Sequence, residues 1–533
     1  MKMAQLSELN HMYDLIEYQA ETNGQKPYIL CDDAVISFDE FNRYTLKVAN
    51  GMVAQGGKPG HGVALFMGNC PEYLYLFHGL PRTGMYSIPI NTALKGDGLR
   101  YILKHSDAKY LVADDALYSR IADLGDDIGG IEKIFIRKTS DSYQIPGKCI
   151  NLNELFNSSS EKLDYTFDPE SITYLMYTSG TTGFPKGVVN RLKSQNIQGA
   201  IALASFQVMP EDVLFTALPL FHANALIITA TLSLAAGVPF GLEKSFSASG
   251  FWDQIRKYGA TQFNAIGAMI PILMKQPEKP DDADNPVRLV ISAACPTSLW
   301  EAFEKRFGLK IWEAYGAVDG GGVLIMNFGH APVGSIGNGQ LIGTDWRIVD
   351  DEKNDVETGD IGELLTLAKG GKSGGVEYYK NKEASEKKCS DGWVNTGDLF
   401  FADKDKNLYF VDRKTDSIRR RGENISSFEV ENILEKHPDV DICAAFGVPS
   451  ELGEDEVMVW IKPTNGNALN FKNLIGYCAD TMAYFMVPRF IDIVDDIPRT
   501  GTLRVQKTIM KQQGVTAVTW DREKEMPGLQ LKK

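Results

Sequence analysis

The stretch Tyr177–Val189 reads YTSGTTGFPKGVV and joins hydroxyl side chains, glycines and one lysine in a short run. Glycines let a backbone come close to a ligand, amides and hydroxyls donate hydrogen bonds to oxygen, and an ammonium neutralises negative charge. The stretch therefore predicts a loop that wraps phosphate groups. The predicted phosphate-binding residues are Thr178, Ser179, Gly180, Thr181, Thr182, Gly183 and Lys186.

Two other interpretations of this stretch are weaker. It is not a Walker loop, because no glycine directly precedes Lys186 and no Ser or Thr follows it. A lone GTTG would be a solvated turn between a strand and a helix. The length of this run, and the strand-like apolar segment Ile172–Met176 before it, favour phosphate binding.

Length, charge and cysteine content narrow the class of protein. A chain of 533 residues exceeds what one core usually serves, so we expect two or more domains. The net charge of -14 argues against nucleic acid as a general partner. The 7 cysteines form no CxxC pair or Cys/His cluster, so we expect neither disulfides nor a zinc site, and we expect a cytoplasmic location.

Neither the N-terminus nor the most apolar stretch has a membrane signature. The first residues carry charges throughout and lack the apolar core of a signal peptide. Ala223–Leu242 is apolar, but Asn224, Ser233 and Pro239 interrupt it and leave a run that is short for a bilayer. We expect a buried helix followed by a strand there, and no integral membrane segment.

Alternation of short apolar strands with helices predicts an α/β fold. Up to about residue 333 the pattern predicts two packed α/β sheets with parallel strands, and a small β-barrel follows it. These units form a large N-terminal domain, residues 1–414. A small mobile α+β C-terminal domain, residues 415–533, follows a boundary near Thr415. Within the first domain we expect helices over 190–208 and 297–307, the second capped by Thr297 or Ser298.

The opening stretch resembles the phosphate loop of the AMP-forming adenylating enzymes, which include acyl- and aryl-CoA synthetases, luciferase and peptide-synthetase adenylation domains. The resemblance covers nearly the whole chain, because further family motifs follow in order. It implies that a carboxylate attacks the α-phosphate of ATP to give an acyl-adenylate and pyrophosphate. A thiol, usually of coenzyme A, then displaces AMP. The first half joins two anions, so the protein mainly positions groups and neutralises charge.

Residues 312–319, WEAYGAVD, resemble the family's YGxTE motif. The resemblance implies that Tyr315 stacks on adenine and that Asp319 helps to hold Mg²⁺. Val318 stands where the family has a threonine that bonds the α-phosphate, a loss of about 0.5–1.5 kcal/mol for one hydrogen bond. Aspartate is one methylene shorter than the family glutamate and can still serve a hard cation. The implied adenine site comprises Ala294, Glu313, Ala314, Tyr315 and Gly316.

Two later motifs resemble the ribose- and thiol-handling parts of the family. Asp398 in NTGD and Arg413 in VDR imply contacts with the ribose of ATP. The run RRRGENIS, which begins at Arg419, implies that Arg421 and Gly422 bind coenzyme A, with arginines near its phosphates. This run looks most like the crotonobetaine/carnitine-CoA ligase-like branch and some fatty acyl-CoA synthetases.

The segment Ile497–Lys507 resembles the family's PRTxTGKVxK motif. Its catalytic lysine position holds Arg504, which keeps the positive charge but is planar and never neutral. Lys507 matches the motif's second lysine and is implied to supply a cation to ATP. The alternative is that this motif has lost its role.

For the acid substrate, the sequence gives one exclusion. Peptide-synthetase domains place an aspartate after the phenylalanine of this region, whereas His222 follows Phe221 here, so amino-acid activation is disfavoured. His222 is an implied acyl-pocket residue or, alternatively, a core histidine bonded to a carbonyl. Gly267 is implied to line the same pocket, and the small residues around it predict an apolar acyl or alicyclic group.

The leading hypothesis is an AMP-forming carboxylate–CoA ligase that uses ATP, Mg²⁺ and coenzyme A, with Lys186, Asp319 and Arg504 as catalytic residues. One alternative is an adenylating enzyme with another acceptor. Another is a catalytically impaired nucleotide- or acyl-binding homologue, which Val318, Asp319 and Arg504 motivate. We expect small-molecule partners and no nucleic acid, and a homodimer stays open.

Overall fold

The computed structural model describes residues 8–178, 185–195, 197–266, 269–322, 324–339, 343–371, 375–414, 416–420, 423–449, 455–464, 469–499, 505–527 and 529. Backbone contacts divide the chain into two compact units. Unit 1 comprises residues 1–333, 339–344 and 367–394, and unit 2 comprises residues 334–338, 345–366 and 395–533. The predicted domain boundary at Thr415 lies outside the described residues and stays a prediction.

The first sheet of unit 1 has seven strands in the order β7-β6-β5-β3-β4-β8-β9. All pairs are parallel except β8–β9, so helices cross from strand to strand as predicted. The strands are β3 (Gly62–Phe66), β4 (Tyr86–Pro89), β5 (Ala108–Asp114), β6 (Lys133–Arg137), β7 (Cys149–Asn151), β8 (Ile172–Thr178) and β9 (Lys186–Arg191), and the helices are α4 (Pro71–Gly79), α5 (Gly96–His105), α6 (Tyr118–Ala122) and α7 (Asn153–Phe156).

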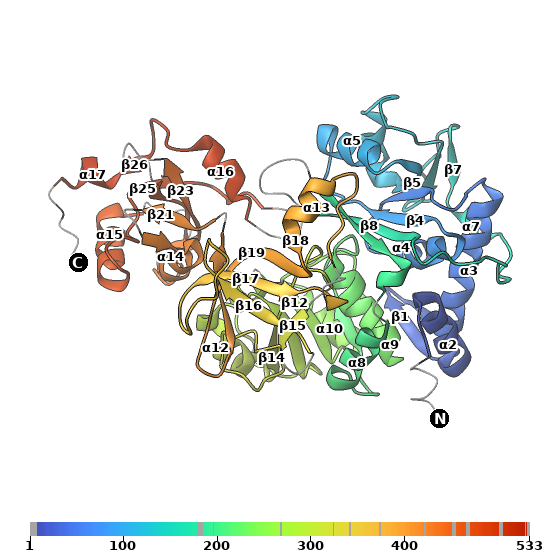
Figure 1. Cartoon of the computed structure of the whole chain (residues 1–533), viewed down its shortest axis with the longest axis horizontal. Coiled ribbons are helices and arrows are strands. Elements are labelled where there is room, and N and C mark those ends of the chain that lie inside the picture. Colours follow the sequence, from blue (N-terminus) through green and yellow to red (C-terminus); the bar gives the residue numbers. More distant parts are fainter. Residues whose placement is uncertain are drawn as a thin grey trace. The chain divides into compact units, whose positions relative to one another are not determined.

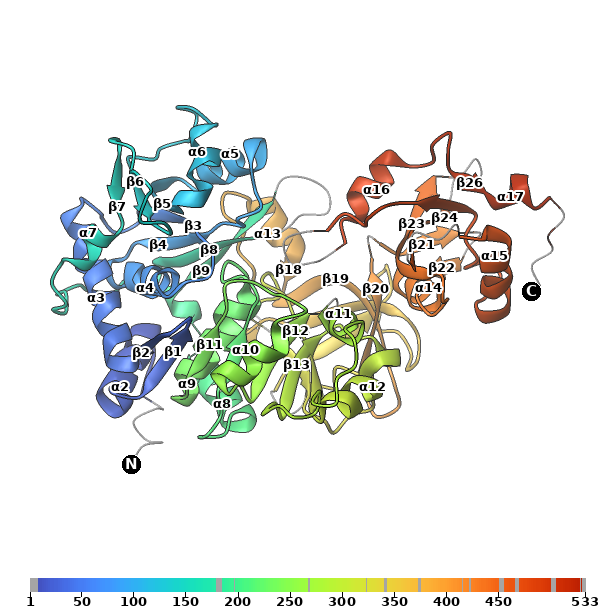
Figure 2. The ribbon, with the colours of Figure 1, turned by 180° about the vertical axis from the view of Figure 1, so that it is seen from behind.

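The second sheet of unit 1 has eight strands in the order β15-β14-β13-β12-β10-β11-β1-β2. Its interior pairs are parallel, and the edge strands β2 and β15 are antiparallel. Helices α10, α11 and α12 cover one face of this sheet, which is seen from that side in Figure 2. The elements are β1 (Pro27–Cys31), β2 (Ala34–Ser37), β10 (Leu214–Thr216), β11 (Phe240–Leu242), β12 (Gln262–Ile266), β13 (Leu289–Ala293), β14 (Lys310–Gly316), β15 (Leu324–Asn327), α10 (Phe251–Tyr258), α11 (Met269–Met274) and α12 (Thr297–Phe307).

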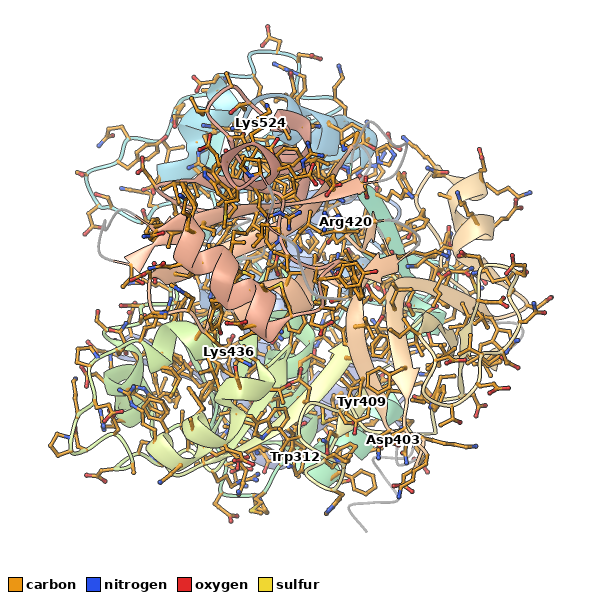
Figure 3. All side chains as sticks on the ribbon, turned by 90° about the vertical axis from the view of Figure 1, so that its left-hand side faces the viewer. Trp312, Asp403, Tyr409, Arg420, Lys436 and Lys524 are labelled. Atoms are coloured by element: carbon orange, nitrogen blue, oxygen red, sulfur yellow. The ribbon has the colours of Figure 1, made fainter. Side chains whose placement is uncertain are left out.

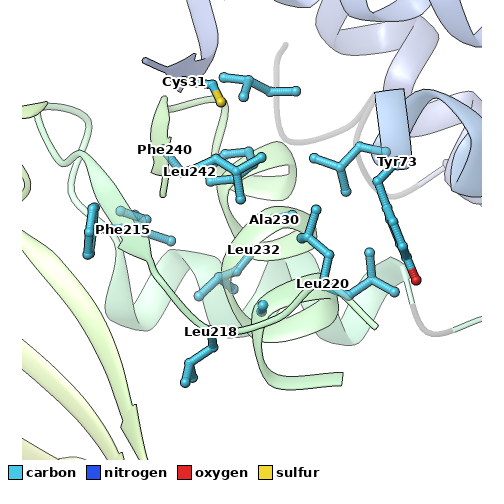
Figure 4. Packing of buried hydrophobic residues seen from close by; sticks show 14 of the residues in the cluster. Cys31, Tyr73, Phe215, Leu218, Leu220, Ala230, Leu232, Phe240 and Leu242 are labelled. Atoms are coloured by element: carbon cyan, nitrogen blue, oxygen red, sulfur yellow. The ribbon is translucent and has the colours of Figure 1, made fainter. Parts of the chain in front are cut away.

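Strands of both sheets and the helices between them contribute to one hydrophobic core in unit 1. Figure 4 shows part of it, where Tyr73 of α4 lies near Leu220, and Phe215 and Phe240 of the second sheet belong to the same cluster. The Ser37 hydroxyl accepts from the Glu40 amide at 3.1 Å and caps the start of α3 (Phe38–Ala54). Helix α2 (Met12–Asn23) precedes it.

The apolar stretch 223–242 forms a buried helix and then a strand, as predicted. The helix begins as a π-helix, Asn224–Thr231, continues as α9 (Leu232–Ala236) and leads to β11. Within the described residues, no helix has the length and apolarity that a membrane crossing requires.

Two local predictions were wrong. The helix expected over 190–208 is only α8 (Ile197–Gln207), because residues 186–191 extend strand β9 with valines that favour a sheet. The opening stretch therefore includes the end of β8 and the start of β9, which pair with each other, and it does not lead directly into a helix. Helix α12 spans the predicted residues, but its N-cap is Pro296 and no side chain caps it.

Unit 2 contains most of a five-stranded sheet in the order β16-β17-β19-β18 (Figure 1), and β20 pairs with β19. The β19–β20 hairpin ends where the Tyr409 hydroxyl donates to Asp403 at 3.1 Å (Figure 3). The strands are β16 (Trp346–Val349), β17 (Gly362–Leu367), β18 (Cys389–Ser390), β19 (Trp393–Ala402) and β20 (Leu408–Arg413). Helix α13 (Lys382–Lys388) and strand β18 belong to unit 1.

The last part of unit 2 is α+β, as predicted. A four-stranded sheet in the order β23-β24-β25-β26 and the hairpin β21–β22 carry helices α14 to α17. The elements are β21 (Ile418–Arg420), β22 (Glu423–Ile425), β23 (Val440–Pro449), β24 (Asp455–Pro463), β25 (Phe490–Ile493), β26 (Trp520–Asp521), α14 (Ser427–Leu434), α15 (Phe471–Thr481), α16 (Lys507–Gln513) and α17 (Arg522–Glu525).

Candidate active site

The two ends of the predicted phosphate loop meet across the β8–β9 hairpin. Thr178 lies opposite Lys186, and its hydroxyl donates to the Lys186 carbonyl at 3.4 Å. The Lys186 side chain is exposed, and no carboxylate of the described residues forms an ion pair with it. Its ammonium lies 5.1 Å from the ring centroid of Tyr378. The predicted loop residues Ser179, Gly180, Thr181, Thr182 and Gly183 lie outside the described residues.

Tyr378 reaches Lys186 because its own segment pairs with β9. The Tyr379 amide donates to the Gly187 carbonyl at 2.8 Å, and the Val189 amide donates to the Glu377 carbonyl at 2.9 Å. An isolated bridge joins Val188 to Tyr378. The segment therefore extends the sheet at its edge and holds Tyr378 beside the first residue of β9.

Asp319, the predicted metal ligand, is held by two groups of unit 1. The Tyr378 hydroxyl donates to Asp319 Oδ2 at 2.6 Å, and Lys388 Nζ lies 3.2 Å from the same oxygen. Burial and the neighbouring Asp319 raise the pKa of Tyr378, so its hydroxyl stays protonated and donates. Tyr378 and Lys388 were missed by the sequence analysis. The paired tyrosines after a glycine-rich segment were the only local signal.

The residues around Asp319 suit Mg²⁺ bound together with ATP. Both donors lie on Oδ2, and no donor from the described part of the chain lies on Oδ1. Among those residues no group of three His, Cys, Asp or Glu side chains could hold a metal by itself. Mg²⁺ typically takes one or two carboxylates and completes its shell with water and phosphate oxygens, so one carboxylate fits.

A buried carboxylate fixes the turn at the predicted adenine site. Glu313 is 5% exposed and accepts from the amides of Ala294 and Cys295, the second at 3.2 Å. Ala294 follows strand β13 with a φ of 69°, a left-handed conformation that costs energy in a residue with a Cβ. Burial raises the pKa of Glu313 to about 7, although the amide bonds oppose the shift. The Glu313 side chain therefore positions the Ala294 backbone.

The rest of the predicted adenine motif lies at the end of β14. Tyr315 pairs with Ile325 and Gly316 pairs with Leu324 of the edge strand β15. Tyr315 is half-buried and Gly316 is exposed. Val318 packs on the cluster that contains Val188 and Tyr378, so its methyl groups have a packing role. Ala314, the remaining predicted member, is half-buried on β14.

His222, the predicted acyl-pocket residue, lies just before the π-helix. Burial lowers its pKa to about 4, so the ring is neutral at pH 7. Its Nε2 is buried without a hydrogen-bond partner among the described residues, which does not favour the carbonyl-bonded alternative for that nitrogen. The Phe221 ring centroid lies 4.6 Å away. Gly267 lies outside the described residues.

In unit 2 the two residues that are predicted to bind ribose lie side by side. Asp398 of β19 lies directly opposite Arg413 of β20, with Nε of the arginine 3.9 Å from Asp398 Oδ1. Gly397 has a φ of 79°, and its carbonyl accepts from the Lys414 amide at 2.9 Å. A glycine suits this conformation because a side chain would be strained there.

Lys507 of unit 2 lies in a different environment from the one expected. Its ammonium is 2.8 Å from Glu431 and donates to Ser427 Oγ at 2.5 Å, and its side chain is 12% exposed. The buried Asp412 carboxylate accepts from the amide and hydroxyl of Ser427 at 2.6 and 2.8 Å. Burial opposes the charged ammonium, but Glu431 and Asp412 outweigh it and raise the pKa of Lys507. The contact of Lys507 with ATP stays a prediction.

The arginines of the run that begins at Arg419 were expected near the phosphates of coenzyme A, and this expectation fails for the central one, Arg420. Arg420 is 2% exposed, forms an ion pair with Glu456 at 2.7 Å and donates to the Phe485 carbonyl at 2.8 Å. It is a core residue of unit 2 and is not placed to meet the phosphates of coenzyme A. The predicted residues Arg421, Gly422 and Arg504 lie outside the described residues.

Comparison with known proteins gives concordant matches. A family model described as AMP-binding enzyme matches residues 16–371, and one described as AMP-binding enzyme C-terminal domain matches residues 429–503. Crotonobetaine/carnitine–CoA ligase of Salmonella typhi is 30% identical over 487 residues, which cover 89% of this chain and 93% of the relative.

Solved structures share the fold. An anthranilate CoA ligase in complex with anthranoyl-AMP has a TM-score of 0.85 and 23% identity, and the match covers 95% of this chain and 98% of that chain. A benzoate CoA ligase from Burkholderia xenovorans LB400 has a TM-score of 0.82 and 21% identity, over 94% of this chain and 100% of that chain.

Proposed function

Because this chain belongs to the AMP-binding enzyme family, we propose that it is an ATP-dependent carboxylate–CoA ligase. Such a ligase forms an acyl-adenylate and pyrophosphate from an acid and ATP, and then forms acyl-CoA and AMP. The predicted family, fold class and AMP-forming type of enzyme are confirmed by these matches. ATP and CoA are co-substrates in AMP-forming ligases.

The observation that carries the proposal is the pairing of an exposed cation with a fixed carboxylate. Lys186 and Asp319 both contact Tyr378, one through its ring and one through its hydroxyl. In the adenylation step Lys186 neutralises negative phosphate charge, and Asp319 would hold Mg²⁺. When bound, Mg²⁺ supplies further charge neutralisation for the attack of one anion on another.

The remaining predicted roles complete the proposal. Asp398 and Arg413 hold the ribose, Tyr315 stacks on adenine, and Arg504 offsets the charge that develops during attack. We also propose Arg421 and Gly422 for coenzyme A. A small C-terminal domain, residues 415–533, reorients between the two half-reactions.

The acid that we propose has an apolar body. His222 is neutral at pH 7 and lies against the Phe221 ring, so this part of the pocket offers no cation to a second carboxylate. The 7 free cysteines favour a reducing cytoplasm, which we propose as the location. A homodimer is the oligomer that we propose to test by light scattering.

The test is release of AMP and pyrophosphate across a panel of short, medium, branched and aromatic acids, with and without CoA. We expect CoA-dependent AMP release with at least one apolar acid. An acyl-adenylate that accumulates and does not respond to CoA would instead support another acceptor. Tight ATP binding without pyrophosphate exchange for any acid would support the impaired homologue, which Val318 motivates.

A further inference from the structure

Four side chains of unit 1 form a continuous chain of contacts, which we call the tyrosine bridge: Lys186, Tyr378, Asp319 and Lys388. The ammonium of Lys186 lies 5.1 Å from the Tyr378 ring centroid, and the hydroxyl of the same tyrosine donates to Asp319 Oδ2 at 2.6 Å. Lys388 Nζ lies 3.2 Å from that oxygen. The bridge joins strand β9, the Tyr378 segment, the turn after β14 and helix α13.

The two residues without a predicted role are firmly anchored. Tyr378 is 5% exposed, and its amide donates to Ser385 Oγ at 2.8 Å. Ser385 lies in α13, whose N-cap Asn381 accepts from the Ala384 amide at 3.0 Å. The Lys388 side chain, at the end of this helix, is 15% exposed. The capped helix and the paired segment therefore present Tyr378 and Lys388 to Asp319 as one rigid element.

We propose that Tyr378 and Lys388 are positioning residues that hold Asp319 for the adenylation half-reaction and set its response to Mg²⁺. The inference rests on the proposed function, because it assigns roles within that ATP site. A hydrogen bond and an ion pair on Oδ2 leave Oδ1 for a cation. An aspartate that is held in one rotamer loses less conformational freedom on binding than a free one.

The two residues affect Mg²⁺ in opposite directions. The Tyr378 hydroxyl is neutral, so it orients Asp319 without cancelling its charge. The Lys388 ammonium also orients Asp319 but competes with a metal for its charge. Loss of the hydroxyl should therefore weaken the response to Mg²⁺. Loss of the ammonium should strengthen it while the carboxylate loses its alignment for the reaction.

The experiment compares Tyr378→Phe and Lys388→Met with two matched controls on the neighbouring surface. Phenylalanine keeps the ring that faces Lys186 and removes only the hydroxyl. Tyr379→Phe and Lys380→Met make the same chemical changes at residues that contact Asp107, at 2.8 and 2.7 Å, away from Asp319. Lys388→Arg tests rescue by a conservative cation.

The first measurement needs no acid substrate. The shift in melting temperature on addition of ATP is followed as Mg²⁺ is titrated. We expect the half-saturating Mg²⁺ concentration to rise at least fivefold in Tyr378→Phe and to fall at least threefold in Lys388→Met. Lys388→Arg, Tyr379→Phe and Lys380→Met should lie within twofold of wild type. The second measurement is pyrophosphate exchange, where both test variants should lose at least tenfold in kcat and the controls less than twofold.

The outcomes separate this inference from the proposed function. If the half-saturating Mg²⁺ concentration shifts in opposite directions in the two variants, but the wild type adenylates no acid, the tyrosine bridge is supported and the proposed ligase activity is refuted. Mg²⁺ shifts of the same sign in both variants, or values within twofold of wild type in folded protein, would overturn the bridge alone. A wild type that ATP does not stabilise at any Mg²⁺ concentration would overturn both.

Discussion

Two lysines that family motifs assign to ATP differ sharply in their surroundings. Lys186 of unit 1 is exposed, and its ammonium lies on the face of an aromatic ring. Lys507 of unit 2 is 12% exposed and forms an ion pair with Glu431 while Asp412 lies nearby. An aromatic face leaves a cation its full charge for a ligand, whereas a carboxylate neutralises it. A motif position therefore identifies a lysine, but its neighbours decide whether its charge is available.

Because of this contrast, we expect the removal of each lysine to have a different consequence for the protein. Removal of Lys186 takes nothing from a core, because its side chain faces solvent. Removal of Lys507 leaves two carboxylates beside each other with burial already raising the pKa of each. We therefore expect Lys186 to matter for rate and Lys507 for stability.

The largest expected effect is that of Lys186→Met on the rate of the adenylation step. We expect acid-dependent pyrophosphate exchange to fall about 10²–10³-fold, because a preorganised charge at a phosphate group contributes about 3–4 kcal/mol to the transition state. The melting temperature should stay within about 2 °C of wild type, since a surface substitution changes stability by about 0.5 kcal/mol or less. Lys193→Met, on an exposed lysine paired with Glu170 at 2.5 Å, is the control. Exchange within threefold of wild type would contradict the role of Lys186.

Lys507→Met tests the expected role of Lys507 in the stability of unit 2. The substitution leaves Glu431 and Asp412 without their cation, and breaking a buried pair costs about 3 kcal/mol or more. Urea unfolding monitored by fluorescence should show a lower midpoint for the transition of unit 2. Lys524→Met provides the control, because that lysine is 81% exposed and lies 4.0 Å from Asp521. A Lys507 variant as stable as the Lys524 variant, but unable to bind ATP, would restore the role that the motif implies.

The smallest expected effect concerns Glu313, because burial raises its pKa to about 7 from the usual value of 4.5 for a glutamate. Between these values the unfolded chain ionises Glu313 and the folded chain keeps it protonated. The contribution of Glu313 to stability is therefore full below pH 4.5 and is lost as pH rises through about 7. Glu313→Gln should reduce this pH-dependent decrease in the free energy of unfolding by roughly 1–3 kcal/mol. The measurement is unfolding free energy at pH values from 5 to about 8, and parallel curves for variant and wild type would refute it.

Local signals in the sequence predicted much of the fold. Helix α12 covers the predicted residues and ends at Gly308, which has a φ of 70°. Strand–helix alternation predicted both parallel sheets, because buried strands and amphipathic helices carry different periods. The π-helix of residues 224–231 was not predicted, because a mostly apolar stretch has no periodicity that separates helix types.

Part of the candidate site followed from motifs, and part required tertiary structure. The strand register placed Asp398 opposite Arg413, as the motif pair implied. The contacts of Tyr378 and Lys388 with Asp319 join segments more than fifty residues apart, so no spacing in the sequence reveals them. The burial of Arg420 and Lys507 was not predicted either, because lysine and arginine side chains are mostly exposed and their buried partners lie far away in the sequence.

The segment that pairs with β9 also has a consequence for protein engineering. Residues 375–388 carry Tyr378 and Lys388 together, and the backbone bonds to Gly187 and Val189 fix their alignment. Such a segment is a natural unit for exchange between related chains. A chimera that replaces it would alter the supports of Asp319 in one step and leave the lysine of β9 and the nucleotide loop in their native sequence. Metal response could then be inherited as a module, separately from nucleotide recognition.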